Sequence, residues 1–321
     1  MSNGQKNRFD GMKGMSHQTK CTIVMYHYVR DGGEYPKINA LSVNKFQRQL
    51  DYIAATFTVI SLEEYADFLS GSSLAGTNLC VLTFDDGLKE HYLTVFPILK
   101  ERKLTASFFP MTQPLSEHVV SAFHKVHFLL AKIGSRMLAD QFNLLLETGF
   151  PELLKKHLVD DRVKKQPKYK WDDNLTANLK LSIATLPSKA KDAILSQLFS
   201  KFLGDEEMFS QKLYMNSEEM KEMQEAGMSY GGHTHAHPML SHLSVEEQRS
   251  ELKLAKQILD DTLSRKTRLF SYPYGDFNED TVSILKREGY RCAVTTSFSI
   301  NVGRVDPFAL GRLDTNDVPF A

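Results

Sequence analysis

The sequence predicts an α/β protein, a distorted or incomplete, TIM-like (β/α) barrel of seven to eight strands with a large helical insertion. Short apolar runs that are typical of buried strands alternate with amphipathic helices between residues 21 and 296. Such alternation favours parallel strands joined by right-handed crossovers. A flat, doubly wound sheet is the alternative. No Gly-rich phosphate-binding loop follows any expected strand, which weakens a nucleotide-binding interpretation.

The expected strands and helices follow from hydrophobic periodicity. The strands cover residues 21–26, 57–60, 79–82, 104–109, 228–230, 268–272, 290–296 and 308–310. The helices of the framework cover residues 43–55, 90–102, 217–226, 244–264 and 278–288, with a short one after Ser61. Ser61 with Glu64, and Ser244 with Glu247, have the spacing of a capping box, which starts a helix.

Residues 115–215 interrupt this alternation, because they contain helical periodicity and no convincing strand. We therefore expect one barrel domain over residues 21–321, with a helical insertion at about 115–215 and a flexible N-terminal tail over residues 1–20. The insertion is either an appendage that adds packing or solubility, or a cap or docking surface beside a site, where long insertions often lie.

Composition excludes several classes of function. The 321 residues include 39 Lys and Arg and 39 Asp and Glu, so the net charge is zero and no basic nucleic-acid groove is indicated. No apolar run is long enough to span a membrane, and the first 20 residues contain no apolar leader segment. The three cysteines lack paired spacing, which favours buried free thiols. We expect a cytoplasmic protein without a nucleic-acid partner; the oligomeric state is not indicated.

Asp85 and Asp86 follow the apolar strand of residues 79–82, and Gly87 allows the backbone to turn away. Burying two adjacent carboxylates is costly unless a cation binds one of them and the other takes part in chemistry. A bare Asp-Asp-Gly sequence is more often a solvated turn, so the functional interpretation depends on the rest of the chain.

Three histidines, His233, His235 and His237, follow the strand of residues 228–230. One turn of chain would bring His233 and His237 to the same ion, and Pro238 favours an irregular turn over a helix. Because catalytic groups of such barrels lie at the C-terminal ends of strands, Asp86 would complete an Asp-His-His set with open coordination positions. The alternative is that these are ordinary surface or core histidines.

A third stretch, Tyr272-Pro273-Tyr274-Gly275, also follows a strand. It is either a simple aromatic Pro-Gly turn or a groove wall with a backbone N–H donor. In order, Thr-Phe-Asp-Asp-Gly at 83–87, His-Thr-x-x-His-Pro at 233–238 and this stretch resemble the motifs of the polysaccharide deacetylases of carbohydrate esterase family 4. Tyr-His-Tyr-Val at 26–29 resembles the first-strand motif of a branch that includes cell-surface and lipopolysaccharide sugar deacetylases.

The resemblance implies a metal-dependent hydrolase that removes an N-acetyl group from an amino sugar. By this resemblance Asp86, His233 and His237 bind one divalent metal, usually zinc, and Asp85 is the general base. The backbone N–H of Tyr274 would help to stabilise the oxyanion. The chemistry is reasonable in itself, since bound zinc lowers the pKa of water towards ~7 and an adjacent carboxylate can accept the proton. Thr234 is expected to orient the metal-binding loop.

Two features of the family pattern are missing. Many members have an Arg before the Pro-Tyr of the third motif; here no Arg is present, and Arg312 is expected to hold Asp85 instead. Many members also end with a Leu-x-His that supplies the general acid, whereas no histidine follows His242. His27, His124, His127 or metal-bound water are the candidates, with His124 and His127 more typical of a helix surface. His235 is expected to be a bystander.

We therefore expect a zinc-dependent sugar N-deacetylase that acts in the synthesis of a surface polysaccharide or lipopolysaccharide. The missing leader segment favours a nucleotide-linked or lipid-linked N-acetylated sugar or glycan as the substrate. The alternatives are a sugar O-acetyl esterase and a catalytically inactive barrel that binds glycan.

Overall fold

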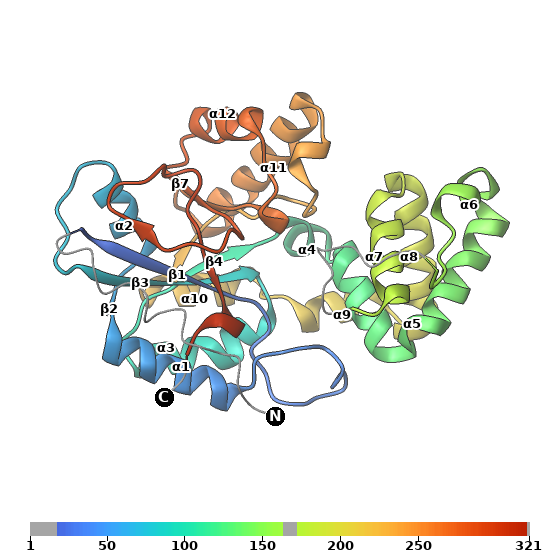
Figure 1. Ribbon diagram of the computed structural model, residues 1–321, viewed down its shortest axis with the longest axis horizontal. Coiled ribbons are helices and arrows are strands. Elements are labelled where there is room, and N and C mark those ends of the chain that lie inside the picture. Colours follow the sequence, from blue (N-terminus) through green and yellow to red (C-terminus); the bar gives the residue numbers. More distant parts are fainter. Residues whose placement is uncertain (1–17, 163–171, 320–321) are drawn as a thin grey trace.

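The computed structural model describes residues 18–162 and 172–319. Most of the expected N-terminal tail, residues 1–17, lies outside the described residues. One body contains the strands and the helices around them, such as α1 (Val43–Thr56), and a group of helices that includes α5 (Ala122–Gly149) stands beside it (Figure 1).

The main sheet has the strand order β5-β4-β3-β1-β8, with β2 also paired to β3 and β9 also paired to β1. Its strands are β1 (Lys20–Tyr26), β2 (Thr58–Val59), β3 (Asn78–Asp86), β4 (Ser107–Pro110), β5 (Ser229–Tyr230), β8 (Asn301–Val302) and β9 (Leu313–Asp314). All of these pairs are parallel except β1 with β8. The parallel strands therefore present their C-terminal ends at one edge of the sheet.

A second sheet consists of β6 (Leu269–Ser271) and β7 (Cys292–Val294), which are also parallel. Two isolated parallel bridges connect it to the rest, one between Gly232 and Phe270 after β5 and one between Val294 and Leu310 before β9. The strands thus follow one another around an incomplete ring in the order β1, β3, β4, β5, β6, β7 and β9. The predicted α/β class with a distorted barrel is confirmed.

Helices of the framework lie where periodicity predicted them. They are α1 (Val43–Thr56), α2 (Leu62–Leu69), α3 (Phe96–Glu101), α10 (Ser217–Glu225), α11 (Val245–Leu263) and α12 (Glu279–Arg287). Both predicted capping boxes are present, since Ser61 and Glu64, and Ser244 and Glu247, exchange side-chain and backbone hydrogen bonds. Each therefore satisfies N–H groups at the start of its helix.

Two predicted elements are wrong in detail. The helix expected over residues 90–102 begins with a π-helical turn, His91–Val95, because Pro97 has no N–H to donate to the preceding turn. The strand expected over residues 308–310 is absent. Asp306 accepts a hydrogen bond from the N–H of Phe308 and forms a turn there, and only Leu310 keeps a bridge. The last strands are instead the two-residue β8 and β9.

The described residues of the insertion form helices and short loops and contain no strand. It contains α4 (Thr112–Glu117), α5 (Ala122–Gly149), α6 (Pro151–His157), α7 (Asn174–Thr185), α8 (Ser188–Leu203) and α9 (Glu206–Leu213). Leu138 and Phe142 of α5 and Leu195 of α8 belong to a core of its own. Gly134 interrupts α5 with φ 78 and ψ 165, so the first part of this helix points away from the direction of the rest. None of the described helices has the length and hydropathy that a bilayer crossing requires.

The barrel core lies directly below the strand ends. Tyr26 and Phe84 stack at 4.9 Å between ring centroids, and Phe84 stacks on Phe108 at the same distance. All three rings are fully buried. Since Phe84 immediately precedes Asp85, this packing fixes the end of β3 from which both aspartates project.

Candidate active site

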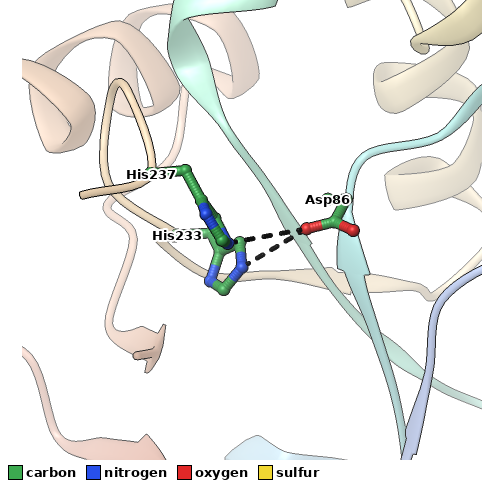
Figure 2. Close-up of side chains that lie close together, drawn as sticks. All are labelled: Asp86, His233 and His237. Carbon is green, nitrogen blue, oxygen red and sulfur yellow. Dashed lines mark ion pairs between the residues drawn. The ribbon is translucent and has the colours of Figure 1, made fainter. Parts of the chain in front are cut away.

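Asp86 lies opposite His233 and His237 at the C-terminal edge of the barrel (Figure 2). Its Oδ1 atom is 3.5 Å from Nε2 of His233 and 3.9 Å from Nε2 of His237. One donor atom from each of the three residues lies within 4.8 Å of the others, and all three residues are buried. The structure thus brings together two segments that are far apart in the sequence.

The loop after β5 holds the two histidines in fixed orientations. Nδ1 of His233 is 2.8 Å from the carbonyl oxygen of Ser271, which makes Nδ1 the protonated nitrogen and leaves the Nε2 lone pair towards Asp86. The backbone N–H of His237 donates to Oγ1 of Thr234 at 3.0 Å. Glu251 of α11 accepts from the N–H of His235 at 2.8 Å and so holds the outer side of the loop.

Gly231 is required by close packing at the start of this loop. A Cβ there would lie 2.3 Å from Cε1 of Phe109 and 2.6 Å from the carbonyl oxygen of Leu269. The loop can therefore approach β4 and β6 only because this residue has no side chain.

Backbone strain is concentrated at the same edge. Asp86, Thr234, His237 and Tyr274 have φ values of 77, 64, 61 and 58. A left-handed conformation costs a non-glycine residue of the order of 1–2 kcal/mol. Strained residues that converge on one place are characteristic of functional sites.

Asp85 is held by the guanidinium group of Arg312. Nη1 donates to Oδ1 at 2.9 Å and Nη2 donates to Oδ2 at 2.7 Å, while Ser271 Oγ also donates to Oδ2 at 3.2 Å. Burial raises the pKa of Asp85, but the charges of Arg312, His233 and His27 and the hydrogen bonds from Arg312 together outweigh this effect, and the pKa is about 2. The carboxylate is therefore ionised over the whole physiological range.

The donor set of Asp86, His233 and His237 fits a divalent cation. In the described part of the chain, no Lys or Arg forms an ion pair with Asp86, although its side chain is buried. Burial and the neighbouring His233 lower the pKa of His237 far below its ordinary value, so this ring stays neutral. Burial opposes protonation of His233 too, but Asp85 and Asp86 raise its pKa. A bound cation would take the place of a proton on His233 and would balance the charge of Asp86.

The other predicted residues line the mouth of the site. Nε2 of His27 is 3.9 Å from Oδ2 of Asp85, and the His27 side chain is 39% exposed. The rings of His237 and Tyr274 lie 4.6 Å apart, and Phe123 of α5 covers His237 at 4.3 Å. A cavity of about 1860 Å³ opens above these side chains, between the barrel and the insertion.

Three further residues were misjudged or missed. His124, which was expected on a helix surface, is fully buried, with Nε2 3.5 Å from Oδ2 of Asp86. Its position depends on the packing of α5, which periodicity does not reveal. Ser271 and Phe123 were not predicted; Ser271 does lie in the motif where an Arg is usual. His235 lies 3.0 Å from side-chain oxygens of Thr112 and Glu117, outside the cluster, and its role as a bystander stays a prediction.

A family model for polysaccharide deacetylases matches residues 75–156 and 204–293. These segments make up more than half of the chain and contain both Asp85 and Asp86 and the histidine loop. The chain belongs to the polysaccharide deacetylase family. The resemblance found in the three motifs is therefore confirmed.

Individual deacetylases agree with this assignment. A Bacillus subtilis protein described as a polysaccharide deacetylase, YxkH, is 31% identical over 126 residues, or 39% of this chain and 43% of that protein. The match thus spans less than half of that relative's length.

Three solved structures share the fold. The Streptococcus pyogenes deacetylase PplD, solved with acetate, is 22% identical with a TM-score of 0.59, and 93% of each chain is covered. IcaB from Ammonifex degensii is 20% identical with a TM-score of 0.57, covering 92% of this chain and 91% of that one. A de-N-acetylase from Aggregatibacter actinomycetemcomitans is 16% identical with a TM-score of 0.56, covering 92% and 95%.

Proposed function

We propose that the protein is a metal-dependent deacetylase that removes the N-acetyl group from an amino sugar. The observation that carries the proposal is the buried cluster of Asp86, His233 and His237, with Asp85 beside it and an open cavity above. Membership of the polysaccharide deacetylase family supports the same reaction class. The proposal takes residues 21–321 as one catalytic domain in which the insertion forms a wall of the cavity.

Asp86, His233 and His237 would hold the cation. One carboxylate and two imidazoles suit zinc and leave positions for water and substrate. When bound, zinc would supply Lewis-acid polarisation of the acetamide carbonyl and a lowered pKa for the nucleophilic water.

Asp85 would accept the proton of the attacking water. Its carboxylate is ionised and cannot rotate freely, because Arg312 binds both of its oxygens. A carboxylate with a pKa of about 2 is a weak base, so the reaction needs an attacking water whose own pKa is already lowered by the cation. This requirement explains why Asp85 is useful only next to the cation-binding cluster.

His27 would protonate the leaving amine. Its Nε2 atom is near Asp85 and its side chain reaches the cavity, as a group that meets the substrate must. His91 donates a hydrogen bond from Nε2 to the carbonyl oxygen of His27 at 2.9 Å, which fixes the backbone at this point. The Tyr274 backbone N–H stays the predicted donor to the oxyanion.

The substrate would be a glycan or a conjugated sugar. The cavity exceeds the ~300–1,000 Å³ of ordinary small-molecule pockets, which favours a ligand larger than one sugar ring. A nucleotide-linked or lipid-linked precursor of a surface polysaccharide or lipopolysaccharide meets this requirement.

Acetate release from a panel of N-acetylated sugars tests the proposal. The panel contains free, nucleotide-linked, lipid-linked and oligomeric substrates, and the zinc-loaded protein is assayed for acetate and for the new amine. We expect equal amounts of acetate and amine from at least one class, and none after Asp86→Ala. O-acetylated sugars serve as the comparison, and acetate from them alone would overturn the amide specificity. No acetate from any member would overturn the proposal.

A further inference from the structure

We propose that the helical insertion supplies a positioning residue, His124, which together with Tyr214 fixes the Asp86 carboxylate for cation binding. This inference rests on the proposed function, because it concerns the same site. It gives the insertion a role in the chemistry that neither a solubility appendage nor a simple lid would have.

His124 is directed at the oxygen of Asp86 that the other histidines do not approach. It lies in the first turn of α5 and is fully buried. Its Nε2 atom is 3.5 Å from Oδ2, whereas His233 and His237 approach Oδ1. Within the described residues this Nε2 atom has no hydrogen-bond partner. A shift of about 0.5 Å would close a normal N–H···O bond to the carboxylate.

Tyr214 determines which nitrogen of His124 carries the proton. The Tyr214 hydroxyl oxygen accepts a hydrogen bond from the backbone N–H of Ser121 at 3.2 Å and lies 2.6 Å from Nδ1 of His124. Burial raises the pKa of Tyr214, so the phenol stays protonated and its O–H donates a hydrogen bond to Nδ1 of His124. The neutral ring then carries its own proton on Nε2, where it can donate to Asp86.

This tautomer makes His124 a support for Asp86, not a further cation ligand. A protonated Nε2 has no lone pair to offer an ion. A donor on Oδ2 would stop the carboxylate from turning, so that Oδ1 stays directed at His233 and His237. Hydrogen bonds of this kind, from residues that contact a metal ligand but not the metal, commonly contribute 10- to 100-fold to metal affinity.

The end of the insertion is joined to the chain beside Asp86. Tyr214 forms an antiparallel bridge with Leu88, and the N–H of Met215 donates to the carbonyl oxygen of Gly87 at 2.9 Å. The hydroxyl that orients His124 is therefore fixed relative to the end of β3. The insertion reaches the site through α5 at its beginning and through Tyr214 at its end.

Zinc affinity of the metal-free, full-length protein tests this inference. Competition with a chromophoric chelator gives Kd for the wild type and for the variants His124→Ala, His124→Gln and Tyr214→Phe. We expect about 10- to 100-fold weaker binding for His124→Ala, with partial recovery in His124→Gln, whose amide can still donate to Asp86. Tyr214→Phe, which removes only one oxygen, should weaken binding about tenfold or more.

Matched control variants separate a specific loss of zinc affinity from a general disturbance of the fold. His157→Ala removes another buried histidine of the insertion, on α6, and Tyr65→Phe removes another buried hydroxyl, on α2. Both should bind zinc like the wild type, and thermal unfolding checks that each variant folds. If His124→Ala does not fold, Tyr214→Phe decides.

Each contrary result has a distinct meaning. Wild-type affinity in both folded variants, His124→Ala and Tyr214→Phe, would overturn this inference and leave the proposed function intact. An equal loss in His157→Ala would also overturn it, because the effect would then be one of helix packing. A wild-type protein that binds no zinc would overturn both proposals.

Discussion

Arg312 binds both carboxylate oxygens of Asp85 although 227 residues separate them, and both side chains are buried. Arg312 also donates from Nε to the carbonyl oxygen of Thr295 at 2.7 Å. This planar contact both neutralises the aspartate and fixes its direction. The neighbouring Asp86 takes no part in this contact, which leaves it for the proposed cation.

Loss of the two hydrogen bonds from the Arg312 guanidinium group to Asp85 should therefore impair both activity and stability. Arg312→Lys keeps the charge but makes at most one of the two bonds to Asp85, and we expect kcat/KM to fall about 100-fold through misplacement of the base. Arg312→Ala removes the guanidinium partner of the buried Asp85 carboxylate and should cost about 3–5 kcal/mol of unfolding free energy. Urea denaturation and acetate assays measure these effects. Arg304→Lys, on the protein surface, is the control. Unchanged activity in Arg312→Lys would contradict this role.

Asp85→Asn should separate cation binding from catalysis. The amide has nearly the same shape but accepts no proton, so acetate release should fall by about 10²- to 10⁴-fold while zinc stays bound. Metal analysis and acetate assays on one preparation measure both quantities. If this variant kept full activity, Asp85 could not be the base.

Gly231→Ala should disturb the histidine loop. The new methyl group would collide with the Phe109 ring and with the Leu269 carbonyl, so we expect a loss of about 1–3 kcal/mol and weaker zinc binding. Gly149→Ala, where a methyl group would meet nothing within 4 Å, is the matched control. Thermal unfolding and chelator competition measure the effects. Equal behaviour of the two variants would count against the close packing at Gly231.

His91 should make the fold less stable in acid. Burial lowers its pKa from 6.5 to about 4, so the unfolded chain binds a proton at pH 4–6.5 that the folded chain does not. The contribution of neutral His91 to the free energy of unfolding is therefore complete above pH 6.5. It is lost as the pH falls towards 4, by up to about 3 kcal/mol. Urea denaturation at pH 4.5 and pH 7.5 measures this loss. His91→Gln cannot titrate and should show a smaller loss; an identical loss would exclude His91 as the cause.

The arrangement of the candidate site was largely predictable because its residues lie in short local patterns. Asp86 and the histidine loop each follow an apolar strand, and parallel strands place their C-terminal ends on one edge. Arg312 could be expected because a buried Asp85 needs a cationic partner and the usual Arg position contains no Arg.

The remaining features depend on packing that periodicity does not encode. His124 reaches Asp86 because the first turn of α5 packs against the site, where the neighbouring Phe123 also covers His237. The strand expected at residues 308–310 failed because one side chain, Asp306, forms a turn within an apolar run. Two-residue strands such as β8 are too short to leave a periodic signal.

Anomalous X-ray diffraction from crystals of the zinc-loaded protein tests the central claim most directly. We predict one strong zinc peak bonded to Asp86, His233 and His237 at about 2.0–2.2 Å, with Asp85 beside it and still paired with Arg312. A peak bonded to other residues, or none at this cluster in protein that releases acetate, would contradict the account.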